Sequence, residues 1–355
     1  MPYNELDYHT FFIDILMLIM DKLDSLQYGR AIAALLVVIA HSSNQFYMYQ
    51  STGHELLDGI IGQMVNAGNI GVYIFFVISG YIMSYTTKNK EFNHKYALTF
   101  IKRRFKRIFP IYWVYLSILV TMWYFGLALR SEHFSLQKVM LAYFLIPDGN
   151  DSGQIITPVM SQSWTLSYEI FFYLCFFALI VIGTSKKHLV TCLSVVFFML
   201  FIFAHQGILP SDVSNAFYSK WLIFLFIFGI AIEQSSKKLK EWLSFLSDSA
   251  MIWLSALTIL IAVFSPKNEV LACILSTLAL CFILQVKKPF PRLELIGDAS
   301  YTIYLTHNFI IMGYGMFAKR VDAPLISALM AVAAAIATIP FGLLCYNLIE
   351  KRIHR

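Results

Sequence analysis

Charged residues are scarce in this sequence. Asp, Glu, Lys and Arg make up 14% of its 355 residues, against about 25% in soluble domains. Mean hydropathy is +0.66, and apolar runs near or above the membrane-spanning length of about 18 residues recur throughout. This composition excludes a soluble domain and gives no sign of nucleic-acid binding. We predict an all-α polytopic membrane protein in contact with membrane lipid.

Cysteine is also rare, and its placement excludes two classes of site. All five cysteines fall in apolar runs and none has the spacing of metal ligands: Cys175, Cys192, Cys273, Cys281 and Cys345. They are typical of small buried apolar residues, and they do not form a disulfide or zinc pattern. We therefore predict no metal site and no permanently bound cofactor.

About ten transmembrane helices can be drawn, at 27–47, 66–86, 108–129, 164–182, 189–205, 219–234, 248–264, 268–286, 299–317 and 324–349. Ten crossings put both termini on one side. Of the 27 Lys and Arg residues, 21 fall in the segments on that side, so the positive-inside rule predicts that both termini are cytoplasmic. Residues 1–25 are predicted to be an N-terminal interfacial segment, 26–352 the membrane domain and 353–355 a cytoplasmic tail.

Arg30 and His41 lie in the first apolar run, where ionisable residues usually mark function. Eleven helical steps bring them to within about 20° of the same face, roughly 16 Å apart along the axis. That is roughly the span from the phosphates to the thioester of an acyl-CoA. His41 is a candidate general base; alternatively, it only hydrogen-bonds a neighbouring helix.

A basic run, 102–110, precedes the third predicted span. In it, Arg104 and Arg107 are three residues apart and face the same way if the segment is helical. Arginine can bind phosphate through two parallel hydrogen bonds. These residues are therefore candidates for binding a phosphorylated donor. The alternative is that they set topology or contact anionic lipid.

The fourth predicted span begins with Trp164, Ser167 and Glu169 near its outer end. Glu169 is a candidate orienting carboxylate or acceptor contact, and Trp164 and Ser167 are further candidates. The alternative for Glu169 is a hydrogen-bonded interface residue. Just before this span, the apolar segment 139–146 is too short to cross the membrane, and we expect a short helix lining an outer cavity.

Two further motifs lie in the second and ninth spans. Residues 71–80 carry glycines and Ser79, which favour close helix packing. In the ninth span, Tyr301, Tyr304 and His307 recur every three residues and form one polar stripe. Aromatic anchoring at the membrane interface explains Tyr301, but it explains the deeper His307 less well.

In this order, the motifs resemble those of the acyltransferase-3 family of membrane acyltransferases. The matching residues are Arg30 with His41, Gly71–Gly80, Arg104 and Arg107 with Pro110 and Tyr112, Trp164-Thr-Leu with Glu169, Gly297 and Ser300-Tyr to His307, and Asn347 to Lys351. They cover about residues 26–352. Exopolysaccharide and O-antigen O-acetyltransferases look closest, because this sequence shows no long extracellular esterase-like domain.

The resemblance implies transfer of an acyl group, usually acetyl, from cytoplasmic acyl-CoA to a hydroxyl of a cell-surface or lipid-linked glycan. It implies a multi-pass protein of a bacterial plasma (inner) membrane. His41 would be the catalytic residue, Arg30, Arg104 and Arg107 would bind the phosphates of acetyl-CoA or brace the pocket, and Glu169 would belong to the outer part of the site. One position departs from the pattern: Tyr73 stands where the family often has Asp.

Two other functions fit the same sequence. A transporter or flippase of a lipid-linked glycan would use the Tyr- and Trp-rich outer segments to bind sugar, but it would need no acyl donor. A non-catalytic scaffold in a polysaccharide assembly complex would tolerate the loss of Arg30 and His41. No motif specifies an oligomeric state.

Overall fold

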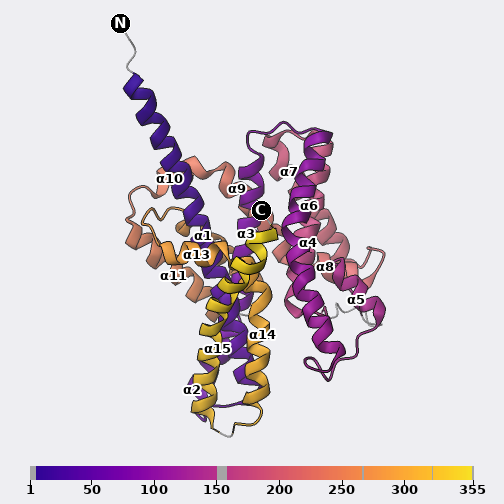
Figure 1. The fold of residues 1–355 in the computed structure, drawn as a ribbon. Coiled ribbons are helices and arrows are strands. Elements are labelled where there is room, and N and C mark those ends of the chain that lie inside the picture. Colours follow the sequence, from indigo (N-terminus) through magenta and orange to yellow (C-terminus); the bar gives the residue numbers. More distant parts are fainter. Residues whose placement is uncertain (1–4, 150–157, 266–267, 322, 354–355) are drawn as a thin grey trace.

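The computed structural model describes residues 5–149, 158–265, 268–321 and 323–353, and within them the regular elements are all helical (Figure 1). The first half contains α1 Glu5–Tyr49, α2 Glu55–Met64, α3 Ala67–Thr87, α4 His94–Tyr124, α5 Leu136–Tyr143, a 3₁₀ turn Ser161–Ser163 and α6 Trp164–Val181. The second half contains a 3₁₀ turn Lys186–His188, α7 Leu189–His205, α8 Asp212–Tyr218, a 3₁₀ turn Trp221–Phe224, α9 Leu225–Gln234, α10 Ser236–Leu243, α11 Asp248–Phe264, α12 Glu269–Ile283, α13 Pro291–Asp298, α14 Ser300–Ala318, α15 Pro324–Cys345, a π-turn Tyr346–Glu350 and α16 Lys351–Ile353.

The prediction of an all-α protein with several membrane spans is confirmed. Six described helices are long and apolar enough to cross a membrane, or up to eight if each of two bent helix pairs is one span. The pairs are α8 with the helix after it, bent by 54°, and α10 with α11, bent by 110°. Each of the ten predicted ranges contains a helix, but the count of ten crossings stays a prediction.

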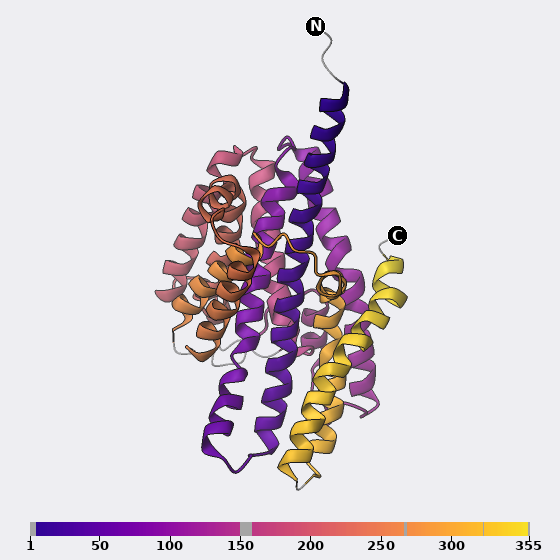
Figure 2. The same cartoon turned by 90° about the vertical axis from the view of Figure 1, so that its left-hand side faces the viewer.

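Helix α1 is the central element of the bundle. It packs against α3, α13, α14 and α15, and small buried residues, including Ala31, Ala33 and Ala34, allow this close contact. Figure 2 shows α1 running the length of the bundle, with its N-terminal part projecting beyond the other helices. Residues 5–25 thus continue the helix that carries Arg30 and His41. Their predicted interfacial location stays a prediction, and most of the predicted tail, 354–355, lies outside the described residues.

Glycines set the spacing of α3 from its neighbours, as the motif at 71–80 predicted. A Cβ atom on Gly71 would lie 2.5 Å from the carbonyl oxygen of Ala33 in α1. On the other side of α3, a Cβ atom on Gly80 would lie 1.9 Å from the carbonyl oxygen of Phe226 in α9. Only glycine permits these backbone contacts. They hold α3 firmly between α1 and α9.

Candidate active site

Three arginines line one small cavity among α1, α3, α4, α6 and α14. Arg30 comes from α1, whereas Arg104 and Arg107 come from the first half of α4, which is helical here from His94. The prediction that Arg104 and Arg107 face the same way is therefore confirmed. The cavity encloses about 80 Å³, and we call it the arginine cavity.

The guanidinium of Arg104 is held in place but not fully hydrogen-bonded. Its Nη2 donates to Oγ1 of Thr86 at 3.0 Å, and its Cζ lies 5.5 Å from the Phe100 ring centroid and 5.8 Å from that of Tyr173. Its Nε is buried without a hydrogen-bond partner among the described residues. A buried donor without a partner is unfavourable by about 1–3 kcal/mol, so this group is suited to an anionic ligand.

Glu169 lies in the arginine cavity. Its Oε1 accepts a hydrogen bond from Ser79 Oγ at 3.0 Å and another from the Tyr173 hydroxyl. The sequence analysis expected Glu169 in the outer part of the site, and that location relative to the membrane stays a prediction; its sharing of one cavity with the arginines of the basic segment was not predicted. The first turns of α6 carry Glu169 to the side that faces α4, so the carboxylate shares a cavity with Arg104 and Arg107.

Tyr304 connects this cavity to a pair of histidines. Its hydroxyl lies 2.8 Å from Oγ1 of Thr165 and donates to the carbonyl oxygen of Gln162 at 2.8 Å. Its ring lines the arginine cavity on one side, and its centroid lies 5.9 Å from that of His307. Tyr301, in the same predicted stripe, instead donates to the carbonyl oxygen of Ile108 at 2.9 Å.

His41 and His307 face each other between α1 and α14. Their ring centroids are 5.0 Å apart, with an interplanar angle of 52°. His307 is fully buried; its Nδ1 lies 3.3 Å from the carbonyl oxygen of Ile303, and its Nε2 has no partner in the described part of the chain. Neither histidine lines the arginine cavity. The structure thus brings together two histidines that are 266 positions apart in the sequence.

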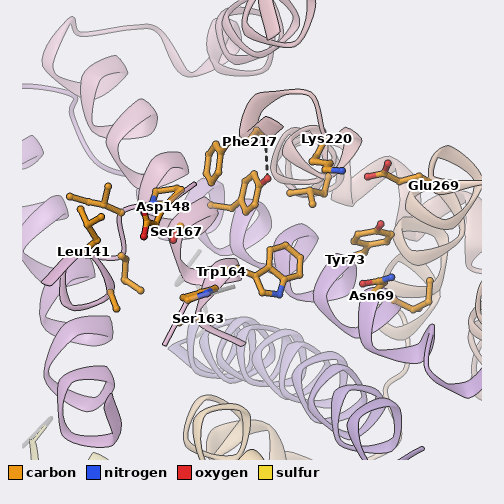
Figure 3. Close-up of a pocket in the computed structure, with 18 of the residues that line it drawn as sticks. Asn69, Tyr73, Leu141, Asp148, Ser163, Trp164, Ser167, Phe217, Lys220 and Glu269 are labelled. Carbon is orange, nitrogen blue, oxygen red and sulfur yellow. Dashed lines mark hydrogen bonds between the residues drawn. The ribbon is translucent and has the colours of Figure 1, made fainter. Parts of the chain in front are cut away.

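A second cavity, of about 480 Å³, contains the other two candidates, Trp164 and Ser167. Figure 3 shows Tyr73, Asn69 and Glu269 on one side of the Trp164 indole, with Asp148, Ser163 and Ser167 on the other. We call it the tryptophan cavity. The helix expected from segment 139–146 is α5, and its Leu141 and Ala142 line this cavity.

The sequence analysis did not identify Asn69 or Glu269 as site residues, and it treated Tyr73 only as a departure from a motif. The first two lie near the beginnings of α3 and α12, where a polar residue is ordinary at a helix end. The sequence feature that could have indicated Glu269 is its position at the start of an apolar run. A carboxylate there is equally explained by its favourable interaction with the helix dipole.

The two cavities follow one another along the same two helices. On α3, Tyr73 lines the tryptophan cavity and Phe76, one turn later, lines the arginine cavity. On α6, Trp164 faces the first and Thr165 the second. The two cavities are therefore neighbours, on either side of the N-terminal turn of α6.

Comparisons with known proteins identify the family of this chain. A family model described as an acyltransferase domain matches residues 23–347. The chain is 28% identical over 308 residues to the exopolysaccharide production protein ExoZ of Rhizobium meliloti, covering 81% of this chain and 91% of that protein. It is 31% identical over 179 residues to an O-acetyl transferase of Shigella phage Sf6, covering 48% of each. It is 30% identical over 167 residues to the acyltransferase MdmB of Streptomyces mycarofaciens, covering 44% of this chain and 38% of that protein. No solved structure matches it.

Proposed function

The chain belongs to the acyltransferase-3 family, and on that premise we propose that it moves an acyl group, acetyl first of all, from cytoplasmic acyl-CoA to a hydroxyl of a cell-surface polysaccharide or its lipid-linked precursor. Its relatives include a protein named for exopolysaccharide production and a phage O-acetyl transferase, which supports a polysaccharide acceptor. The observation that carries the proposal is the arginine cavity, connected through Tyr304 to the His41–His307 pair.

The charge of the arginine cavity supports a phosphorylated donor. Three guanidinium groups line it, and Glu169 is the only carboxylate among its described lining residues. Positive charges within a membrane protein are unfavourable unless they are paired. A pyrophosphate or phosphate of CoA would supply the missing negative charge, and its oxygens would accept from the free Nε of Arg104.

The chemical step is assigned to His41. It takes the proton from the acceptor hydroxyl as that oxygen attacks the thioester carbonyl. The C–S bond then breaks, and the CoA thiolate leaves and takes up the proton. In the covalent alternative, His41 first accepts the acyl group itself, and an acyl-imidazole trapped without acceptor would establish that route.

Loading the donor requires the helices to part. The arginine cavity encloses about 80 Å³, whereas sites for drug-sized ligands span roughly 300–1,000 Å³. We propose that the CoA phosphates bind at the arginines and that its arm enters as α4 and α6 move away from α3. The thioester would then pass Tyr304 to reach His41.

We propose that the chain crosses a bacterial membrane ten times, with both termini in the cytoplasm. The arginine cavity then opens toward the cytoplasm. The lysines in two of the predicted cytoplasmic loops support it, because Lys88, Lys186 and Lys187 line one shallow cavity beside Glu233. In Figure 1 the connection after α3 and the start of α1 lie at the same end of the bundle. Labelling of single cysteines introduced near Lys88 and near Lys138 in intact cells tests this orientation.

The test of function is CoA release from acetyl-CoA by purified protein in detergent. The acceptor is surface polysaccharide from the source cells, stripped of its esters with mild base. We expect CoA release to be lost when His41, or Arg104 and Arg107 together, are replaced by alanine. His205→Ala and Arg103→Ala are the matched controls, because both residues are exposed and line neither cavity.

Each outcome separates the candidate functions. Release that fails in His41→Ala and transfers label to the polysaccharide supports the acyltransferase. Wild-type turnover in His41→Ala contradicts the assigned chemistry. Folded wild-type protein that neither binds acetyl-CoA nor releases CoA would point to the transporter.

A further inference from the structure

The tryptophan cavity is lined by three polar side chains that are not hydrogen-bonded to other described residues. Asn69, Ser167 and Glu269 line it, and none of their side chains forms a hydrogen bond within the described residues. Carboxylate, amide and hydroxyl groups together can both donate and accept hydrogen bonds. Such groups converging on one space are the usual polar component of a ligand site.

The apolar part of the cavity wall is formed by aromatic rings that pack on one another. Tyr168 stacks on Phe217 with ring centroids 3.8 Å apart, and its hydroxyl donates to the carbonyl oxygen of Phe217 at 2.9 Å. Trp164 packs edge-on against Tyr168 at 5.9 Å, and Tyr73 adds a further ring. These rings are held before any ligand arrives, so binding need not order them.

The charges of the cavity distinguish it from the arginine cavity. Its described lining residues include two lysines, Lys138 and Lys220, and two carboxylates, Asp148 and Glu269. This balance does not favour a phosphate group, and the polar side chains do not favour a lipid tail. A neutral sugar offers apolar ring faces to the aromatic residues and hydroxyls to the polar ones.

We propose that the tryptophan cavity is the acceptor site, in which one or two neutral sugar units of the polysaccharide lie against Trp164 and Tyr73. The sugar hydroxyls donate hydrogen bonds to the side-chain oxygens of Glu269 and Asn69. The inference rests on the proposed function, which supplies the polysaccharide. Its volume of about 480 Å³ falls within the range of small-molecule sites. Helices α3 and α6 line both this cavity and the arginine cavity on the donor side.

The test measures binding apart from turnover. Oligosaccharides cut from the ester-free polysaccharide are titrated into detergent-solubilised protein by calorimetry, without acetyl-CoA. We expect Trp164→Ala and Glu269→Gln each to raise Kd about tenfold, because a hydrogen bond to a charged group or a stacked ring contributes on that scale. With acetyl-CoA present, the same variants raise KM for polysaccharide and leave KM for acetyl-CoA unchanged.

Controls separate the cavity from general damage. Trp253→Ala removes an indole that is 72% exposed on α11, and Glu241→Gln removes an exposed carboxylate on α10; both should bind as the wild type does. Trp164→Phe retains an aromatic ring for packing on Tyr168 and should give an intermediate Kd.

Failure of this inference differs from failure of the proposed function. No wild-type binding, or wild-type Kd in both cavity variants, overturns the acceptor site even if CoA is released. Binding that depends on Trp164 and Glu269 without any CoA release supports the cavity and contradicts the acyltransferase.

Discussion

Substitution of Gly80 by alanine should damage both the fold and the donor side of the site. The added Cβ would lie 1.9 Å from the carbonyl oxygen of Phe226, 2.8 Å from its carbonyl carbon and 3.0 Å from its Cα. To restore a contact of 3.0–3.4 Å, α3 and α9 must separate by about 1.1–1.5 Å, the difference from the 1.9 Å distance. All three clashing atoms are backbone, so no side-chain rotation relieves them.

The size of the effect follows from this forced separation. Overpacking of a close interface typically destabilises by about 1–3 kcal/mol, and 1 kcal/mol shifts Tm by roughly 2–4 °C in chains of 150–250 residues. We therefore expect Tm to fall by several degrees. Because Ser79, the preceding residue, holds Glu169 at 3.0 Å, the shift of α3 should also raise KM for acetyl-CoA.

The assay is thermal unfolding in detergent, followed by CoA release below Tm. Gly313→Ala is the matched control, because Gly313 lies in helix α14 and an added Cβ there meets no atom within 4 Å. Alanine favours a helix over glycine by about 0.5–1 kcal/mol, so this variant should keep or raise Tm. If Gly80→Ala unfolded at the wild-type temperature with an unchanged KM, the role assigned to this contact would be refuted.

Three further substitutions test the site and its surroundings. Tyr304→Phe removes the hydroxyl bonded to Thr165 and Gln162 and should lower kcat about tenfold. Tyr314→Phe, farther along α14, loses a bond to Ser327 of α15 and should retain activity; equal rates in the two variants would contradict the bridging role of Tyr304. Arg104→Lys keeps the charge but not the fork of donors, so KM for acetyl-CoA should rise about tenfold, whereas an equal rise in Arg103→Lys, at an exposed position, would contradict a specific role for the donors of Arg104. Among the described residues, Lys88→Ala leaves the carboxylate of Glu233, 2% exposed, with its bond from Ser84 alone. Because Lys88 is itself 57% exposed, the loss should be only about 1 kcal/mol, seen as a lower Tm than that of Lys90→Ala, and identical Tm values would contradict it.

The sequence was sufficient to predict the helices and several of their contacts. Long apolar runs separated by charged loops leave helices as the main option in a bilayer, so each predicted range contains one. Spacing along a single helix predicted the shared direction of Arg104 and Arg107, and the glycines of α3 predicted its close packing. Each of these features follows from the residues of a single helix.

Features that depend on several helices were harder to predict. The position of Glu169 was inferred from its distance to the end of a predicted span, but its environment depends on the direction in which α6 presents it. That direction is set by contacts with α3 and α4, since Ser79 comes from α3 and the arginines from α4. Hydrophobic periodicity gives the buried face of a helix and does not say which neighbour covers it.

The first turn of α6 explains why one motif, from Trp164 to Glu169, carries residues of both cavities. Successive residues of a helix point about 100° apart, so Trp164 and Ser167 can face the tryptophan cavity while Thr165 and Glu169 face the arginine cavity. Thr165 also bonds Tyr304, whose ring contacts His307. A single turn thus contacts the proposed acceptor space, the proposed donor space and the group that connects them to the histidines. A shift of this turn should therefore affect the use of both substrates, whereas Trp164→Ala and Arg104→Lys should each affect one.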